Sequence, residues 1–442
     1  MAIVFVLIAL LVVAVLVTGN WYVWRRLFRD TTEGPGAVRR AGAVVIAGGW
    51  ALTVGALVAE RAGAPFWLQQ VLAWPGFLWL ALALYLLLAV LAGELVRPVL
   101  RRILERRARA SEAAEAAAPI SARPEPIAAG QGAGRGPGGG TGGTDGETDG
   151  GDPAADGAVA GPRETPAAPS RRLFVSRVVG GAAAAAAVGT VGYGTYGVLR
   201  GPRVKRVTVP LAKLPRAAHG YRIAVVSDIH LGPVLGRGFA QKVVDTINST
   251  QPDLIAVVGD LVDGSVKDLG PAAAPLAQLK ARHGSFFVTG NHEYFSGAEQ
   301  WVEEVRRLGL NPLENARTEL PHFDLAGVND VAGEDEGQGP DYAKALGDRD
   351  RGRACVLLAH QPVQIHDAVD HGVDLQLSGH THGGQLFPGN LVAGLANPTL
   401  AGLDRYGDTQ LYVSRGAGAW GPPTRVGAPS DVTVIELASR QA

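Results

Sequence analysis

The sequence predicts an α/β domain in the C-terminal half of the chain, behind an N-terminal region that crosses a membrane. Two patterns predict this division. From residue 203 onward, apolar runs of strand length alternate with helical patterns, which is the rhythm of an α/β sheet. In the first hundred residues, long apolar runs are separated by short charged segments. A chain of 442 residues has room for two or three such units.

Charge and cysteine content exclude some functional classes. The formal net charge is +0, so the chain as a whole carries no positive field, and we expect no nucleic-acid partner. The single cysteine, Cys355, excludes an intrachain disulfide and a cysteine-based zinc cluster. Because Cys355 lies within an apolar run, we expect it to be a small buried residue.

The N-terminal region, residues 1–100, is predicted to hold three transmembrane helices. The runs at 3–17, 41–59 and 78–96 are almost entirely apolar, and with their flanking residues they are long enough to cross a bilayer. The segment 66–77 contains two glutamines, a proline and a glycine, so we expect an interfacial lead-in there.

The placement of arginines predicts how these helices are oriented. Residues 25–40 carry five arginines, and the segment 97–109 is also rich in arginine. The link between the second and third runs carries only Glu60 and Arg61. Since arginine-rich loops stay in the cytoplasm, the N-terminus is expected outside and the end of the third helix inside.

Residues 101–170 are predicted to be a basic juxtamembrane segment followed by a disordered linker. From residue 106 onward, alanine, glycine, proline and acidic residues dominate, and such a composition cannot bury a core. The glycine run at 136–151 follows no strand and lacks a Gly-Lys-Ser/Thr ending. It is therefore not expected to bind phosphate.

Residues 171–200 allow two interpretations. Arg171 and Arg172 precede a weakly apolar Gly/Ala run at 178–198, which resembles a twin-arginine export signal. A fourth transmembrane helix with a basic cytoplasmic flank explains the same residues. Both interpretations predict a multi-pass cell-membrane protein whose domain at 203–442 is extracytoplasmic.

The C-terminal domain is predicted to begin with strands and helices in alternation and to continue with fewer helices between strands. This change favours a mixed sheet, or two sheets packed face to face. The predicted strands are 222–227, 253–258, 285–288, 354–359, 373–377, 410–414 and 432–436.

Polar side chains follow five of these strands. Each short motif is weak or moderately specific alone, since an aspartate after a strand is commonly a turn residue. Ligands in α/β sheets gather at the carboxyl ends of strands, so the conjunction predicts one site. Carboxylate, amide and imidazole ligands suit Mn, Fe or Zn. The residues are Asp228, His230, Asp260, Asn291, His292, His360, His380 and His382.

In this order, the motifs resemble those of the calcineurin-like metallophosphoesterase superfamily. D-x-H matches at 228–230, G-D at 259–260, G-N-H-[DE] at 290–293, a lone histidine at 360 and G-H-x-H at 379–382. The sequences at 378–385 and 416–423 also resemble a bacterial branch that has membrane-tethered and twin-arginine-exported members.

The resemblance implies a fold and a site. The fold is a sandwich of two mixed β-sheets flanked by helices, and the site holds two divalent metal ions that activate a water for attack on a phosphoester. It implies that His292 is the catalytic residue facing the leaving group and that Glu293 orients it. One ion would be held by Asp228, His230, Asp260 and His382, and the other by Asp260, Asn291, His360 and His380.

Several functions remain open at this point. The first is a phosphodiesterase or phosphomonoesterase acting on a lipid-linked, nucleotide or cell-envelope substrate. A pyrophosphatase of the UDP-diacylglucosamine type shares the motifs, but it needs a cytoplasmic substrate, which conflicts with the expected topology. The third possible function is that of a membrane sensor or transport-associated protein with an inactive metal domain. The complete ligand set and the lack of a buried charged pair in the apolar runs argue against it.

Overall fold

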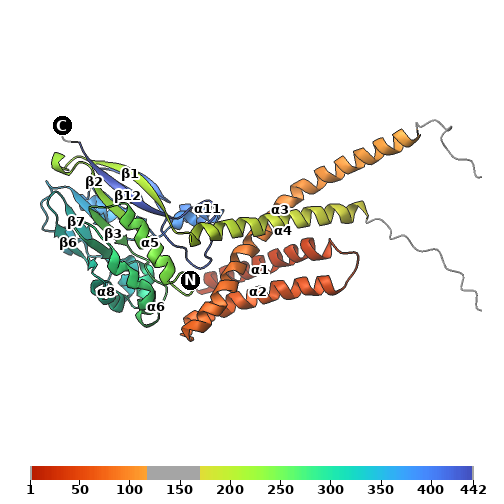
Figure 1. Cartoon of the computed structure of the whole chain (residues 1–442), viewed down its shortest axis with the longest axis horizontal. Coiled ribbons are helices and arrows are strands. Elements are labelled where there is room, and N and C mark those ends of the chain that lie inside the picture. The colour runs from red at the N-terminus through yellow and green to blue at the C-terminus, as the bar shows by residue number, and fades with distance from the viewer. Residues whose placement is uncertain (1, 117–169, 441–442) are drawn as a thin grey trace, which may run out of the picture.

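The computed structural model describes residues 2–116 and 170–440. Long helices extend from one side of an α/β domain, as Figure 1 shows. The predicted linker falls mostly at 117–169, outside the described residues. The long helices are α1 (Ala2–Trp24), α2 (Ala37–Arg61), α3 (Phe66–Ala116) and α4 (Arg171–Leu199), and a π-helical turn, η1 (Arg25–Arg29), follows α1.

Three of the described helices are long and apolar enough to cross a membrane: Ala37–Arg61, Phe66–Ala114 and Arg171–Leu199. They contain the second and third predicted runs and the Gly/Ala run. The first predicted run lies within α1. This part of the chain is therefore suited to membrane association.

The segment 66–77, predicted as an interfacial lead-in, is helical, because α3 begins at Phe66 and continues through Pro75 and Gly76. Packing against α2 explains why the helix continues. The Thr53 hydroxyl of α2 donates a hydrogen bond to the Gly76 carbonyl at 2.8 Å. A Cβ atom at Gly76 would lie 2.7 Å from the Leu52 carbonyl oxygen, so only glycine allows this approach. The same helix extends to Ala116, past the predicted start of the linker.

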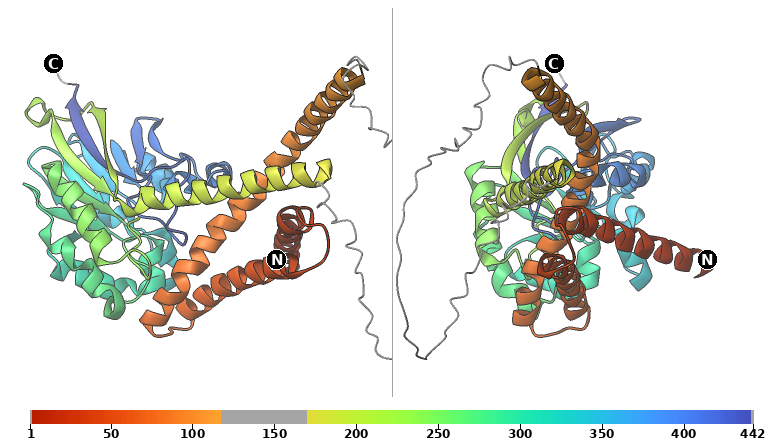
Figure 2. Two further views of the ribbon diagram at one scale, coloured as in Figure 1. Left: turned by 45° about the vertical axis from the view of Figure 1, so that its right-hand side comes forward. Right: turned by 90° about the vertical axis from the view of Figure 1, so that its right-hand side faces the viewer.

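The helices share an arginine-rich end that lies away from the α/β domain (Figure 1 and Figure 2). There, the guanidinium of Arg26 pairs with Glu94 at 2.8 Å, and Arg97 lies 3.3 Å from the same carboxylate. Arg177 of α4 donates to the Thr31 carbonyl at 3.1 Å. The short loop between α2 and α3 lies at the opposite end, beside the domain.

The C-terminal domain contains two mixed six-stranded sheets, which confirms the expected sandwich. The first sheet has the order β1-β12-β2-β3-β4-β5, and the second has the order β10-β11-β9-β8-β7-β6. In the first sheet, β12 pairs antiparallel with β2, whereas β2, β3, β4 and β5 are parallel neighbours. The strands are β1 (Arg203–Leu211), β2 (Tyr221–Val226), β3 (Leu254–Val258), β4 (Ser285–Val288), β5 (Asn311–Pro312), β6 (Ala316–Glu319), β7 (Asp324–Gly327), β8 (Cys355–Leu358), β9 (Leu375–Ser378), β10 (Gly402–Tyr406), β11 (Thr409–Val413) and β12 (Asp431–Ser439).

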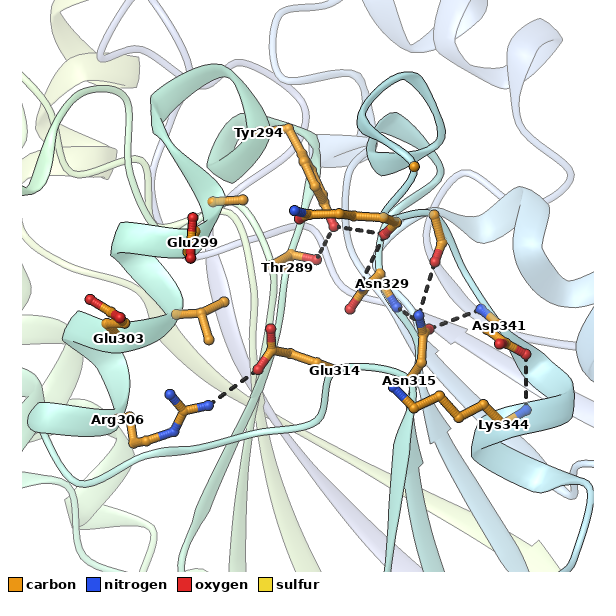
Figure 3. A pocket seen from close by; sticks show the side chains of 15 residues that line it. Thr289, Tyr294, Glu299, Glu303, Arg306, Glu314, Asn315, Asn329, Asp341 and Lys344 are labelled. Carbon is orange, nitrogen blue, oxygen red and sulfur yellow. Dashed lines mark hydrogen bonds and ion pairs between the residues drawn. The ribbon is translucent and has the colours of Figure 1, made fainter.

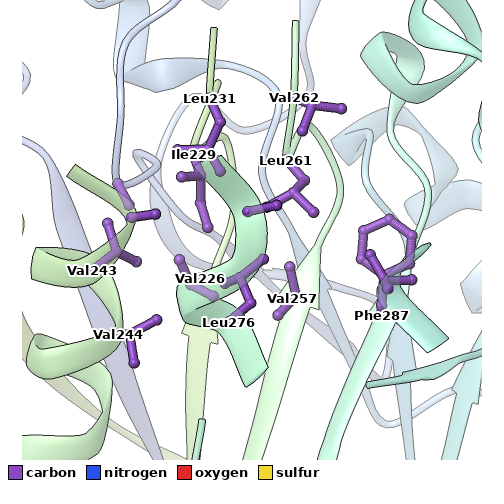
Figure 4. Packing of buried hydrophobic residues seen from close by; sticks show 14 of the residues in the cluster. Val226, Ile229, Leu231, Val243, Val244, Val257, Leu261, Val262, Leu276 and Phe287 are labelled. Atoms are coloured by element: carbon purple, nitrogen blue, oxygen red, sulfur yellow. The ribbon is translucent and has the colours of Figure 1, made fainter. Parts of the chain in front are cut away.

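The core forms on both faces of the first sheet. Along β2, Ile223 and Val225 pack toward the second sheet, whereas Ala224 and Val226 pack toward helices. This alternation follows from the two-residue period of a strand. Figure 4 shows the helix-facing side. The domain helices are α5 (Arg237–Ser249), α6 (Val266–Ala273), α7 (Asn291–Ser296), α8 (Ala298–Arg307), α9 (Tyr342–Leu346), α10 (Ile365–Asp370) and α11 (Gly389–Ala396).

Strand β1 was not predicted, because its basic residues resemble a juxtamembrane flank. Arg203–Leu211 pairs in parallel with β12 along its whole length. Val209 and Leu211 are buried, whereas Arg203 and Lys205 are exposed or half-buried. Charged side chains commonly protect the edge strand of a sheet, so the basic residues are compatible with this position.

Candidate metal centre

All the predicted site residues lie together where strands of both sheets end. Asp228 and His230 follow β2, Asp260 follows β3, and Asn291 and His292 begin α7 directly after β4. The second sheet contributes His360 after β8, and His380 and His382 after β9. The carboxyl ends of parallel strands share one edge, which is why residues far apart in the sequence meet.

Three groups of side chains are close enough to hold metal ions. Two of them consist of predicted ligands, and the third is His230, Asp263 and His292. The possible ligand atoms of Asp228, His230 and His382 lie within 4.8 Å of one another. Within this group, His382 Nε2 is 3.0 Å from His230 Nε2 and 3.3 Å from Asp228 Oδ1.

Asp260, His360 and His380 form the second group, and their possible ligand atoms also lie within 4.8 Å of one another. Asn291 joins it, because its Oδ1 atom lies 3.0 Å from His380 Nδ1.

One carboxylate oxygen lies between the two groups. Asp260 Oδ2 is 3.7 Å from His230 Nε2 in the first group and 3.2 Å from His360 Nε2 in the second. The Asp260 side chain is only 2% exposed, so water cannot screen this charge effectively. A single buried carboxylate can therefore contact cations on both sides.

His360 has the hydrogen-bonding pattern of a metal ligand. Its Nδ1 lies 2.9 Å from the Val258 carbonyl oxygen, which can only accept, so Nδ1 carries the proton. Its Nε2 faces Asp260 on the other side of the ring and is buried without a hydrogen-bond partner among the described residues. A buried ring nitrogen without a hydrogen-bond partner is suited to bind a divalent cation.

The charge balance of the cluster also fits cation binding. Burial alone would raise the pKa of Asp260, but His360 and His230 hold it well below its usual range. Burial lowers the pKa of His230, yet Asp263, Asp260 and Asp228 raise it to about 9. Without another cation, protonated imidazole balances the buried carboxylates, and a divalent ion can take the place of those protons.

Several of these residues adopt a strained backbone conformation that directs their side chains into the site. Asp228, His230, Asp260, His380 and His382 have φ values of 50°, 48°, 52°, 71° and 52°, in the left-handed region. Each costs on the order of 1–3 kcal/mol in a residue other than glycine. Strain of this kind concentrates at functional sites, where the surrounding structure maintains it.

Asp263 was missed as a site residue. Its Oδ1 atom lies 2.9 Å from His230 Nδ1 and 2.7 Å from His292 Nδ1. It therefore orients one candidate ligand and the candidate catalytic histidine together. Its position three residues after Asp260 was visible in the sequence, but many turns carry an aspartate there.

Arg425 was also missed. Its buried guanidinium lies 3.0 Å from His382 Nδ1 and donates to the His382 carbonyl at 3.0 Å. Burial lowers the pKa of Arg425 to about 10, so it stays charged at neutral pH. Nothing in the local sequence distinguishes this arginine from a surface residue.

The expected role of Glu293 is wrong. Its buried carboxylate accepts hydrogen bonds from the backbone N–H groups of Asp260, Leu261 and Gly290, at 2.9, 2.7 and 2.6 Å. Glu293 therefore ties the loop after β3 to the loop after β4, and Asp263 is the residue that orients His292. Such a clamp fixes the backbone positions of Asp260 and Asn291.

A pocket of about 560 Å³ lies near α8, between its side chains and the loop at 337–341 (Figure 3). Glu299, Glu303, Arg306 and Lys344 contribute to its polar lining. None of the candidate metal ligands lines it, so it is separate from the metal centre.

The clamp role of Glu293 can be tested by stability. Glu293→Ala removes the acceptor for three buried N–H groups, and each unsatisfied donor costs about 1–3 kcal/mol. We expect a clear drop in the melting temperature of the detergent-solubilised chain. Glu299→Ala, at an exposed position of α8, is the control and should change little. An unchanged melting temperature in Glu293→Ala would contradict the clamp.

Comparison with known proteins agrees with this geometry. Residues 221–384 match the family model described as calcineurin-like phosphoesterase. The chain is 39% identical over 259 residues to a zebrafish (Danio rerio) protein described as a transmembrane protein with metallophosphoesterase domain. That match covers 55% of this chain and 59% of the zebrafish protein.

Two bacterial relatives are covered almost completely. An uncharacterized metallophosphoesterase of Aquifex aeolicus is 35% identical over 240 residues, covering 53% of this chain and 91% of the relative. The uncharacterized metallophosphoesterase YkuE of Bacillus subtilis is 30% identical over 280 residues, covering 61% of this chain and 98% of the relative. The strand-end ligand groups and these matches lead to one conclusion: the chain belongs to the calcineurin-like phosphoesterase family.

Proposed function

We propose that this protein is a membrane-anchored, metal-dependent phosphohydrolase that cleaves a phosphomonoester or phosphodiester. The observation that carries the proposal is the position of Asp260 Oδ2, within 4 Å of a histidine from each ligand group. A carboxylate shared in this way suits a pair of divalent ions. Membrane anchoring is supported by the three apolar helices and by the zebrafish relative's description as a transmembrane protein.

We propose two ions, of Mn, Fe or Zn. Asp228, His230, Asp260 and His382 would hold the first, and Asp260, Asn291, His360 and His380 the second. When bound, such a pair polarises phosphoryl oxygens and supplies a hydroxide nucleophile at neutral pH.

His292 is proposed as the residue that protonates the leaving group. Its backbone N–H donates to Asp260 Oδ1 at 2.9 Å, which holds it beside the ligand groups. Asp263 engages its Nδ1 at 2.7 Å, so its Nε2 is the nitrogen available to a substrate. An imidazole positioned in this way can act as a general acid.

The proposed domain organisation follows the sequence: a membrane region at 1–100, a basic segment and linker at 101–170, a further helix at 171–200 and the hydrolase domain at 203–442. An extracytoplasmic hydrolase domain is supported by the arginine-rich end of the helices, which lies away from that domain. The contact of Arg177 with Thr31 supports a retained fourth helix, because a cleaved signal would lose it.

The metal-dependent activity can be tested with the full chain in detergent. We expect hydrolysis of bis(p-nitrophenyl) phosphate or p-nitrophenyl phosphate with added Mn²⁺. Asp260→Asn should abolish it and lower the bound metal, because a neutral amide leaves two cations repelling each other. Asp408→Asn, at an exposed turn, is the control. Full metal content and normal turnover in Asp260→Asn would rule out the shared ligand.

The role of His292 can be tested by varying the leaving group. His292→Ala should retain the metals but lower kcat by about 10²–10⁴-fold on an alkyl ester. The loss should be smaller on a p-nitrophenyl ester, whose leaving group needs less protonation. An equal loss on both esters would indicate that His292 positions the phosphate instead.

The topology can be tested by protease treatment of intact protoplasts carrying a C-terminally tagged chain. Loss of the tag is the expected result, because the hydrolase domain is proposed to lie outside. A tag protected in intact cells but digested after lysis would reverse the orientation. Replacing Arg171 and Arg172 by lysine blocks export only if the twin-arginine interpretation holds.

A further inference from the structure

Helix α11 and the segment just before it expose a set of large apolar side chains next to the metal centre. Phe387, Leu391, Val392 and Leu395, which we call the α11 patch, are 53%, 62%, 71% and 90% exposed. Leu391 and Leu395 are four residues apart and so lie on the same side of the helix. An apolar surface of this kind on a folded domain usually has a partner.

The α11 patch is continuous with the membrane-spanning helices. Leu386, just before α11, packs against the cluster formed by Tyr85 of α3 and Val191 of α4. The Tyr85 hydroxyl donates to the Phe387 carbonyl at 2.9 Å. Figure 1 and Figure 2 show α11 on the side of the domain from which α3 and α4 project.

The position of Tyr85 along α3 gives the depth of this contact. Tyr85 lies about 18 Å along the helix from Arg97, at 1.5 Å per residue. The hydrocarbon core of a bilayer is about 30 Å thick. If Arg97 and its neighbouring arginines mark the cytoplasmic boundary, Tyr85 lies in the half of the bilayer nearer the hydrolase domain. The adjoining α11 patch then meets lipid rather than water.

A short path connects the α11 patch to His292. The side chain of Gln385, just before the patch, holds the Trp420 backbone through two hydrogen bonds of 2.9 and 3.0 Å. The Trp420 ring is 57% exposed and lies 5.7 Å from the His292 ring. The exposed ring of Phe295 also lies near His292, with its centre 5.5 Å from the His292 ring. Exposed aromatic rings therefore border the candidate catalytic group, and tryptophan favours the membrane interface.

The end of α2 also lies beside the site. Glu60 interacts electrostatically with both Asp263 and His292. Val234, in the loop after β2, packs against Ala56 of α2 and Phe77 of α3. The side of the site around His292 therefore adjoins the ends of the membrane-spanning helices.

We propose that the α11 patch lies in the leaflet nearer the hydrolase domain and that the substrate is a membrane lipid with a phosphoester in its headgroup. This inference rests on the proposed hydrolase function of the metal centre. A lipid whose chains remain in that leaflet can bring its phosphoester past Trp420 to His292 without leaving the bilayer. A soluble phosphoester gains nothing from the patch.

Membrane insertion of α11 can be measured without any activity assay. The full chain is prepared in lipid nanodiscs with the buried Cys355 changed to alanine and a single Leu395→Cys, labelled with an environment-sensitive fluorophore. The control is Ala217→Cys, an exposed site before β2, at the opposite end of that strand from the metal centre. We expect lipids with nitroxide-labelled chains to quench the label at 395 but not at 217. Equal, weak quenching at both positions would overturn the proposal.

The substrate class can be tested with two esters that share a leaving group. One is p-nitrophenyl hexadecyl phosphate carried in nanodiscs, and the other is soluble bis(p-nitrophenyl) phosphate. The double variant Leu391→Asp/Leu395→Asp should lose about tenfold or more on the lipid ester and less than about twofold on the soluble ester. Ala217→Asp, the control, should change neither rate.

The outcomes separate the two proposals. An equal loss on both esters, or none on the lipid ester, would contradict access through the α11 patch. A wild-type chain that hydrolyses the soluble ester but not the lipid ester would contradict the lipid substrate and leave the hydrolase function intact. A wild-type chain inactive on both esters and on p-nitrophenyl phosphate with every divalent metal would contradict the hydrolase function, while the quenching measurement would still decide whether α11 inserts.

Discussion

The buried carboxylate of Asp260 is the group around which the metal centre is organised. It follows a strand of the first sheet, yet it lies 3.2 Å from His360, which follows a strand of the second. The two sheets must therefore pack in one register for both ligand groups to form. The inter-sheet core formed by residues such as Val225, Val258 and Leu377 maintains that register.

The loops at this edge are held in place by polar contacts as well as by the apolar packing of residues such as Ile229 and Leu261. Glu293 accepts hydrogen bonds from three backbone N–H groups. Asp263 contacts two histidines. The Arg425 guanidinium contacts Nδ1 of His382. Left-handed backbone at Asp228 and Asp260 adds strain that these contacts offset. A rigid, strained edge of this kind suits a site that must keep several like-charged carboxylates close together.

The sequence identified the residues of both proposed ligand groups, because each follows a run of strand length and the motifs keep a fixed order. It missed Asp263 and Arg425, since their contacts depend on how distant loops meet. Strand β1 was missed because its basic residues resemble a juxtamembrane flank, and its partner β12 lies more than two hundred residues later in the chain. The apolar runs located the membrane helices, but the continuity of α3 through Pro75 depends on its packing against α2.

The most direct test of the central claim is anomalous X-ray diffraction from crystals of the full chain loaded with Mn²⁺, Fe²⁺ or Zn²⁺. The account predicts two metal peaks about 3.5–4 Å apart, with the carboxylate of Asp260 between them. Asp228, His230 and His382 should surround one peak, and Asn291, His360 and His380 the other. A single peak, or two peaks that do not share Asp260, would contradict the account.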